Sequence, residues 1–226
     1  MKKAVCLLSG GMDSAVSAAI AKKQGYGIYA LSVDYGQRHK KELSCARKIA
    51  KFLGAKEHKK IKIDLRQIGC SALTADIPVP VGKDAAGIKA SKKIPPTYVP
   101  ARNTIFLSYA LAYAEAVGAE AIYIGANCVD YSGYPDCRPE YFKRFQDMAD
   151  YATKKTVEGK RILIKTPIIG LDKAGIVKKG LELNVPFEHT WSCYQGGTKA
   201  CGECESCVLR LNGFKEAGVM DPILYA

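Results

Sequence analysis

A glycine-rich turn near the N-terminus holds the first residues whose types and spacing suit chemistry. Ser9-Gly10-Gly11-Met12-Asp13-Ser14 stands between an apolar run and a helical pattern. Glycines let a backbone approach an anion, and a helix N-terminus offers unpaired N–H groups and the positive end of its dipole. Asp13 could cap the helix or hold a metal ion bound to phosphates. The turn matches neither common nucleotide motif, G-x-x-x-x-G-K-[ST] or G-x-G-x-x-G, and a plain strand-to-helix turn would share its local pattern.

A cluster of cysteines near the C-terminus suits a metal ion. Four of the nine cysteines, Cys193, Cys201, Cys204 and Cys207, lie within this short stretch. Cys-x2-Cys steps present two sulfurs to one ion, and four thiolates suit tetrahedral zinc. A [4Fe–4S] cluster and two disulfides stay open as alternatives, although disulfides are rare in a reducing compartment. A four-thiolate zinc site is closed, so it would be structural and would hold the C-terminal segment on the core.

The pattern of apolar runs predicts a parallel α/β sheet that positions these groups. Short apolar runs alternate with segments of helical periodicity, which is typical of an open sheet with helices on both faces. Residues 1–184 are expected to form one α/β domain, with 185–226 as a zinc-binding segment and helix packed on it. The expected strands are 4–8, 27–33, 58–65, 121–125 and 161–167; the expected helices are 13–25, 40–52, 103–117, 139–156, 172–183 and 205–217; and 66–100 and 127–138 are expected to be irregular.

Composition excludes several classes of protein. The 226 residues are 48% hydrophobic and 25% charged, which argues against collagenous and disordered chains. No apolar run approaches the roughly 18–20 residues that a spanning helix needs. Only five apolar residues, 4–8, follow Lys2-Lys3, which is short for a signal peptide, so we expect a cytoplasmic protein.

The charge balance is basic without a basic arm. The sequence has 34 Lys and Arg against 22 Asp and Glu, a net charge of +12. The lysines fall in scattered pairs such as Lys2-Lys3 and Lys22-Lys23, not in the long blocks of nucleic-acid arms. We therefore interpret the excess as a solvated surface and expect no tight nucleic-acid binding and no membrane binding.

The glycine-rich turn resembles the Ser-Gly-Gly-x-Asp-Ser signature of the PP-loop ATP pyrophosphatases. Over nearly its whole length the chain is similar to their QueC (ExsB-like) branch, the 7-cyano-7-deazaguanine synthases. One departure is Gly175, where members often carry Glu. The other segments that carry the resemblance are Tyr35-Gly36-Gln37-Arg38-His39, Ser71-Ala72-Leu73-Thr74, 97–104, 130–140, Ser192-Cys193-Tyr194 and 200–207.

This resemblance implies an adenine nucleotide alpha hydrolase-like fold and a carbon–nitrogen ligase. The expected reaction converts 7-carboxy-7-deazaguanine and ammonia to the nitrile preQ0, on the route to queuosine or archaeosine. ATP with Mg²⁺ would activate the carboxylate, and an amide would form and then lose water. A homodimer is common among relatives, but the sequence itself does not give the oligomeric state. The alternatives are a PP-loop tRNA-modifying enzyme, of the thiolase or lysidine synthetase type, and a non-catalytic zinc-bearing nucleotide-binding module.

Site residues follow from the matched motifs. The catalytic candidates are Asp13, Ser14 and Arg102. A guanidinium such as that of Arg102 suits a phosphate or carboxylate, and a carboxylate would accept the N–H donors of a deazaguanine. The full expected sets are Leu8, Ser9, Gly10, Gly11, Met12, Asp13, Ser14, Ala15, Val16, Ser17, Ala18, Tyr35 and Gln37 for ATP, and Arg102, Asn103, Asp130, Tyr131, Tyr134, Asp136 and Arg138 for the second substrate.

Overall fold

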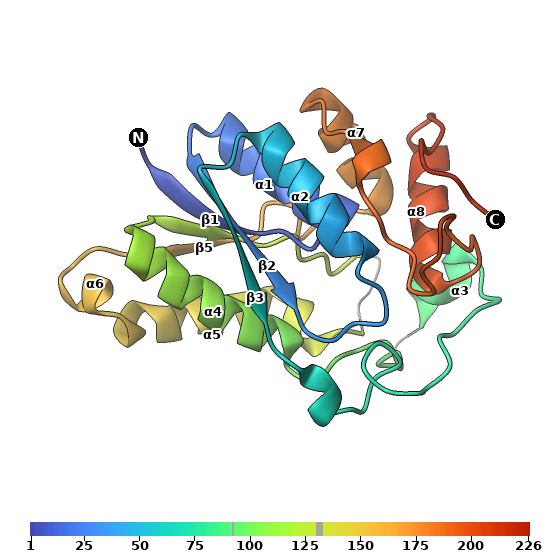
Figure 1. Ribbon diagram of the computed structural model, residues 1–226, viewed down its shortest axis with the longest axis horizontal. Coiled ribbons are helices and arrows are strands. Elements are labelled where there is room, and N and C mark those ends of the chain that lie inside the picture. Colours follow the sequence, from blue (N-terminus) through green and yellow to red (C-terminus); the bar gives the residue numbers. More distant parts are fainter. Residues whose placement is uncertain (92, 130–132) are drawn as a thin grey trace.

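The computed structural model describes residues 1–91, 93–129 and 133–226. Five parallel strands form one sheet in the order β3-β2-β1-β4-β5, which confirms the predicted α/β class (Figure 1). The strands are β1 (Lys3–Leu7), β2 (Gly27–Asp34), β3 (Glu57–Lys62), β4 (Ala121–Tyr123) and β5 (Leu163–Lys165).

Helices cover both faces because side chains alternate along the strands. Ala4 and Cys6 of β1 belong to one buried cluster, with residues of α1, α2, α7 and α8. Val5 and Leu7 belong to the opposite cluster, with residues of α4 and α5. Figure 1 shows these two helical layers. The helices are α1 (Met12–Lys23), α2 (Lys41–Leu53), α4 (Arg102–Val117), α5 (Pro139–Ala152), α7 (Lys173–Glu182) and α8 (Glu205–Glu216).

The strand order puts a topological switch point beside β1. β1 pairs with β2 on one side and with β4 on the other. After β1 the chain therefore turns toward one edge of the sheet, and after β4 it turns toward the opposite edge. Open α/β sheets bind ligands at such a point, outside the carboxyl ends of the strands. The two ends approach closely here, since a Cβ on Gly125 would lie 2.6 Å from the backbone nitrogen of Ser14. Glycine at 125 is what lets the chain after β4 touch the first turn of α1.

Two helix predictions differ from the structure. The single helix expected over 139–156 is wrong: α5 ends at Ala152 and α6 (Lys154–Val157) follows. Thr153 breaks the helix because its side chain and that of Thr156 accept each other's backbone N–H groups, forming a capping box. The stretch 66–100 is not wholly irregular, because α3 (Ala85–Ala90) forms there with Asp84 as its N-cap.

The C-terminal segment shares the main core. Val185, Phe187 and Phe214 belong to the same buried cluster as the residues of α1 and α7. The boundary at residue 184 between the α/β domain and the C-terminal segment stays a prediction. In the described part of the chain, every helix is too short or too polar to cross a membrane.

Candidate active site and cysteine cluster

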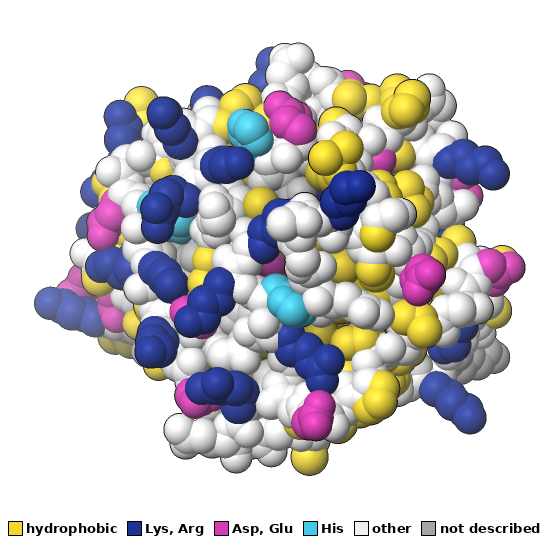
Figure 2. Space-filling view, turned by 45° about the vertical axis from the view of Figure 1, so that its right-hand side comes forward, with side chains coloured by type: hydrophobic (Ala, Val, Ile, Leu, Met, Phe, Trp, Pro, Cys, Tyr) yellow, Lys and Arg dark blue, Asp and Glu magenta, His cyan; other side chains and the backbone are white. Residues whose placement is uncertain are grey.

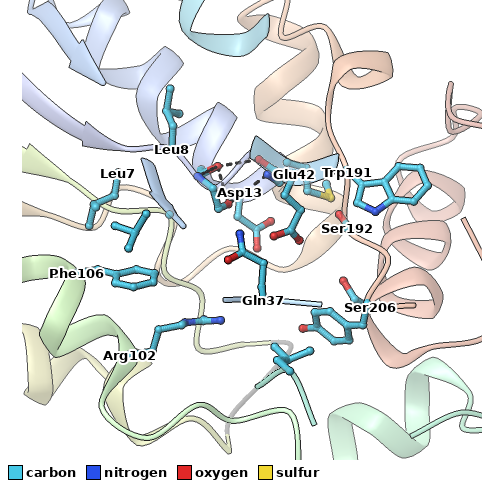
Figure 3. A pocket seen from close by; sticks show the side chains of 18 of the residues that line it. Leu7, Leu8, Asp13, Gln37, Glu42, Arg102, Phe106, Trp191, Ser192 and Ser206 are labelled. Carbon is cyan, nitrogen blue, oxygen red and sulfur yellow. Dashed lines mark hydrogen bonds between the residues drawn. The ribbon is translucent and has the colours of Figure 1, made fainter. Parts of the chain in front are cut away.

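A cavity of about 250 Å³ opens at the carboxyl edge of the sheet, at the switch point (Figure 3). Its walls come from the turn after β1, the segment from the end of β2 into α2, the start of α4, and the chain before α8. Leu7, Leu31 and Phe106 give it an apolar side. Charged side chains from α1, α2, α4 and α7 face the same space, which therefore suits a ligand with both a ring and anionic groups.

Hydrogen bonds within the turn after β1 shape it into a loop. Ser14 Oγ donates to the Gly11 carbonyl at 2.9 Å, and the Gly11 N–H donates to Ser9 Oγ at 3.2 Å. The N-cap of α1 is Gly11, and no side chain caps it, so the helix-capping role considered for Asp13 is wrong. The uncapped helix N-terminus faces the cavity and can receive an anion.

Gly10 has no room for a side chain. Its φ is +94°, and a Cβ there would lie 2.0 Å from the Glu42 carbonyl oxygen of α2. The Gly10 carbonyl also accepts the Trp191 N–H at 2.9 Å. The loop is therefore held between α2 and the C-terminal segment.

Asp13 and Lys173 form an ion pair in the wall of the cavity. Lys173 Nζ lies 2.7 Å from Asp13 Oδ2, and Lys173 is 9% exposed. The other oxygen, Asp13 Oδ1, is buried and has no hydrogen-bond partner among the described residues. An ammonium group and an orphaned carboxylate oxygen beside a helix N-terminus fit a phosphate chain and a divalent cation.

Arg102 enters the cavity from the first turn of α4. Its guanidinium carbon lies 6.0 Å from the centre of the Tyr35 ring, which packs on Phe106 with ring centres 5.5 Å apart. The Gln37 side-chain oxygen accepts the Tyr35 N–H at 2.9 Å, so the Gln37 amide nitrogen remains directed to the cavity side (Figure 3). This end of the cavity combines a cation with flat aromatic surfaces.

Glu42 is a second carboxylate in the wall. Burial raises the pKa of its carboxyl to about 7, while Arg102 opposes this change and Cys193 adds to it. Glu42, Lys173 and Trp191 line the cavity, although the sequence alone did not predict any of them as site residues. A signal for Lys173 was its place just after a predicted strand's carboxyl end, where ligand-binding side chains gather.

The predicted ATP residues divide into two groups. Leu8, Ser9, Gly11, Met12, Asp13, Ser14, Tyr35 and Gln37 line the cavity. The structure does not place Gly10 and 15–18 in that lining. Ala15, Val16 and Ala18 instead pack in the core under α1, and Ser17 is buried. These five support the loop from behind.

The predicted second-substrate residues also divide. Arg102 and Asn103 line the cavity, whereas Tyr134, Asp136 and Arg138 lie outside its described lining. Asp136 Oδ2 accepts the Asn103 backbone N–H at 3.0 Å, so this carboxylate serves the start of α4. Tyr134 shares a 2.8 Å hydrogen bond with Thr97, and Arg138 is exposed. The remaining two candidates, Asp130 and Tyr131, lie outside the described residues.

The four C-terminal cysteines come together as their spacing predicts. Their sulfurs all lie within 4.8 Å of one another, and Cys201 Sγ and Cys207 Sγ are 3.9 Å apart. Sulfurs about 2.3 Å from a tetrahedral zinc ion would be roughly 3.8 Å apart, so the set fits such an ion. Hydrogen bonds among three of the thiols lower the pKa of Cys193 and raise the pKa values of Cys204 and Cys207, so without a metal ion one thiolate is shared by the three. The cluster can hold a metal ion.

The cluster lies directly behind the cavity. Cys193 lines the cavity itself, and the Trp191 indole N–H donates to the Cys193 carbonyl at 3.2 Å. Lys41 Nζ stands 3.4 Å from the centre of the Trp191 ring. A metal that fixed the cysteines would thereby fix one wall of the site.

Comparison with known proteins agrees with this geometry. The family model described as "Queuosine biosynthesis protein QueC" matches residues 3–218. The chain is 56% identical over 227 residues to the 7-cyano-7-deazaguanine synthase of Desulfatibacillum aliphaticivorans, covering 99% of this chain and 97% of that protein. It is 58% identical over 224 residues to the protein of that name from Syntrophus aciditrophicus (strain SB), covering 98% and 96%.

A solved structure supports the fold. The chain aligns with a 4-thiouridine synthetase, crystallised with RNA and ATP, at a TM-score of 0.51 and 23% identity, over 81% of this chain and 41% of that one. Such distant similarity speaks for the fold alone. The family match and the near-full-length identities go further: this chain belongs to the QueC family, the 7-cyano-7-deazaguanine synthases.

Proposed function

We propose that this protein is an ATP-dependent ligase that converts 7-carboxy-7-deazaguanine and ammonia to 7-cyano-7-deazaguanine, which is preQ0. The observation that carries the proposal is the full-length similarity to enzymes of that name, joined to a cavity suited to ATP at the switch point. The route would be activation of the carboxylate by ATP, formation of the amide, and dehydration to the nitrile.

The chain's own residues would act by binding and orienting. N–H groups at the start of α1, the Ser9 hydroxyl and Lys173 would hold the phosphates. Arg102 would orient the substrate carboxylate or the phosphate it attacks. Asp13 Oδ1 would hold Mg²⁺, which neutralises phosphate charge when bound. These placements would bring the carboxylate and the phosphorus atom together at the loop.

We also assign one structural zinc ion per chain to Cys193, Cys201, Cys204 and Cys207. The donor set is four sulfurs, which suits zinc, and all nine cysteines are free of disulfides. Free thiols are typical of a reducing compartment, so the reaction is assigned to the cytoplasm.

Replacing Cys201 with serine is expected to lower the melting temperature by about 5–10 °C, as a loss of roughly 2–3 kcal/mol would in a chain of this size. The effect on kcat should be smaller, because a closed site does no chemistry. Metal analysis should find one zinc in the wild-type chain and none in the variant. The control is Cys70→Ser, at an exposed cysteine outside the cluster. About four irons per chain would contradict the assignment.

The function is tested by incubating the protein with ATP, Mg²⁺, ammonium and 7-carboxy-7-deazaguanine. We expect preQ0 by mass, and the nucleotide analysed in the same reaction distinguishes AMP with pyrophosphate from ADP with phosphate.

The tRNA-modifying alternative predicts submicromolar tRNA affinity near physiological salt, or a modified tRNA as the product. We expect neither, because phosphate-driven binding falls steeply with salt. Figure 2 shows the Lys and Arg side chains of one face interspersed with Asp and Glu.

A further inference from the structure

The wall of the cavity holds one carboxylate that the roles assigned so far do not use, that of Glu42. We propose that Glu42 binds the ammonium ion that supplies the nitrile nitrogen. This inference rests on the proposed function and extends it by assigning a place to the nitrogen donor.

The position of Glu42 is fixed by the phosphate-binding loop. Glu42 lies in the first turn of α2, and its backbone carbonyl touches Gly10 so closely that no Cβ fits between them. Figure 3 shows its carboxylate reaching into the same space as Asp13 and Gln37. A cation held by Glu42 would therefore lie beside the loop, where the substrate carboxylate meets ATP.

The charges of the cavity leave Glu42 as the site for a small cation. Four cationic residues line the cavity, namely Arg38, Arg102, Lys173 and Arg210, and among its described lining residues only Asp13 and Glu42 carry carboxylates. Asp13 is paired with Lys173. Glu42 has no hydrogen bond or ion pair with a described residue, although Arg102 influences it electrostatically. Ammonia exists mainly as ammonium near neutral pH, and this cation needs an anionic partner to enter a site rich in positive charge.

Ammonium fits Glu42 better than two other ligands. An ammonium ion offers only N–H donors, as a lysine head group does, and a carboxylate offers only acceptors. The guanine-like N–H edge of 7-carboxy-7-deazaguanine is on the six-membered ring, whereas its carboxyl is on the five-membered ring. Since the substrate carboxyl is to meet ATP at the phosphate loop, a residue beside this loop lies near the carboxyl and not near the guanine-like edge. Mg²⁺ is assigned to Asp13 instead, because Asp13 Oδ1 is buried and has no hydrogen-bond partner among the described residues.

The test is Glu42→Gln, which keeps the shape and removes the charge. With ATP, Mg²⁺ and 7-carboxy-7-deazaguanine saturating, the KM for ammonium should rise about 10- to 100-fold, the range for loss of a hydrogen bond to a charged group. High ammonium should restore kcat to within a few-fold, and the KM values for ATP and the deazaguanine should change less than about twofold. Glu42→Asp, which keeps the charge, should recover part of the ammonium affinity.

Glu140→Gln is the matched control, because Glu140 is an exposed glutamate in the first turn of another helix, α5. Circular dichroism of each variant checks folding. A rise in the KM for the deazaguanine alone would assign Glu42 to the guanine-like edge, and a rise in the Mg²⁺ requirement alone would assign it to the metal. Either result, or an unchanged KM for ammonium, overturns the proposal.

A second measurement separates this inference from the proposed function. Binding of ¹⁵N-ammonium is followed by NMR line broadening in the presence of a non-hydrolysable ATP analogue and Mg²⁺. Wild type should broaden the signal, and Glu42→Gln should broaden it much less. If wild type makes no preQ0 but the difference in binding remains, the proposed function fails and the ammonium site stands. If wild type makes preQ0 and no difference is seen, the ammonium site fails.

Discussion

Replacing Asp13 with alanine is expected to lower kcat by about 10²–10³-fold while the fold stays intact. Removal of one preorganised group that faces developing charge typically has an effect of this size. Asp13 does two things at once here: Oδ2 holds Lys173 at 2.7 Å, and Oδ1 is buried without a partner among the described residues. The alanine variant would lose the proposed Mg²⁺ ligand. It would also lose the ion pair that holds the Lys173 side chain, which we assign to phosphate binding.

Steady-state formation of preQ0 measures the effect, and Ser14→Ala should also lower kcat strongly. The control is Asp147→Ala, since Asp147 lies on α5 in an exposed ion pair with Arg144. Circular dichroism should be close to wild type for all three, while the melting temperature of Asp13→Ala should fall, because the mostly buried Lys173 loses the Asp13 carboxylate. Near-normal kcat in both Asp13→Ala and Ser14→Ala would disprove the placement of ATP.

Local spacing explains which parts of the site could be predicted. The turn from Ser9 to Ser14 and the cysteines from 193 to 207 are continuous or nearly continuous segments, so their chemistry is visible along the chain. Most strands could also be predicted, because apolar runs near glycines are typical of a buried parallel sheet, whereas the strand at 58–65 is predicted from its alternating pattern. The residue types alone did not show the break at Thr153, where a side-chain capping box overrides helical periodicity.

Other site residues depend on contacts between distant segments. Lys173 is 160 residues from Asp13, and nothing near either residue predicts their ion pair. Glu42 lies on a predicted amphipathic helix, where a charged residue usually faces water. Its place in the cavity follows from the close approach of α2 to Gly10. The contact of Asp136 was likewise not visible in the sequence, because only the folded chain brings its carboxylate to the Asn103 N–H.

Arg210 is the clearest charged residue that its local sequence left unexplained. Its side chain is 0% exposed, and it forms two hydrogen bonds with Asp221, Nε to Oδ2 at 2.7 Å and Nη2 to Oδ1 at 2.9 Å. Nη1 donates to Thr190 Oγ1 at 2.8 Å, and Nη2 also donates to the Phe187 carbonyl at 3.2 Å. The guanidinium therefore joins α8, the C-terminal tail and the segment that leads into the cavity wall.

Arg210→Met is expected to lower the free energy of unfolding by about 3–5 kcal/mol, because it leaves the buried Asp221 carboxylate without its cation, with only the Tyr225 hydroxyl and the Ile223 N–H still donating to it. In a chain of this size the melting temperature should fall by roughly 6–20 °C. Arg161→Met is the matched control. Arg161 makes the same two-bond contact with Asp150, also 11 residues away, but in an exposed place where ion pairs contribute little.

The double variant Arg210→Met with Asp221→Leu separates charge from packing. Removing both buried charges should restore much of the lost stability, since an apolar pair of similar volume often replaces a buried ion pair at little cost. The KM for ATP should be raised in the single and the double variant alike, because Arg210 itself lines the cavity, and Thr190, next to the lining residue Trp191, loses its guanidinium partner. Recovery of both stability and KM would show that the guanidinium only balances charge. Recovery of stability alone would show that it also holds the wall of the active site in place.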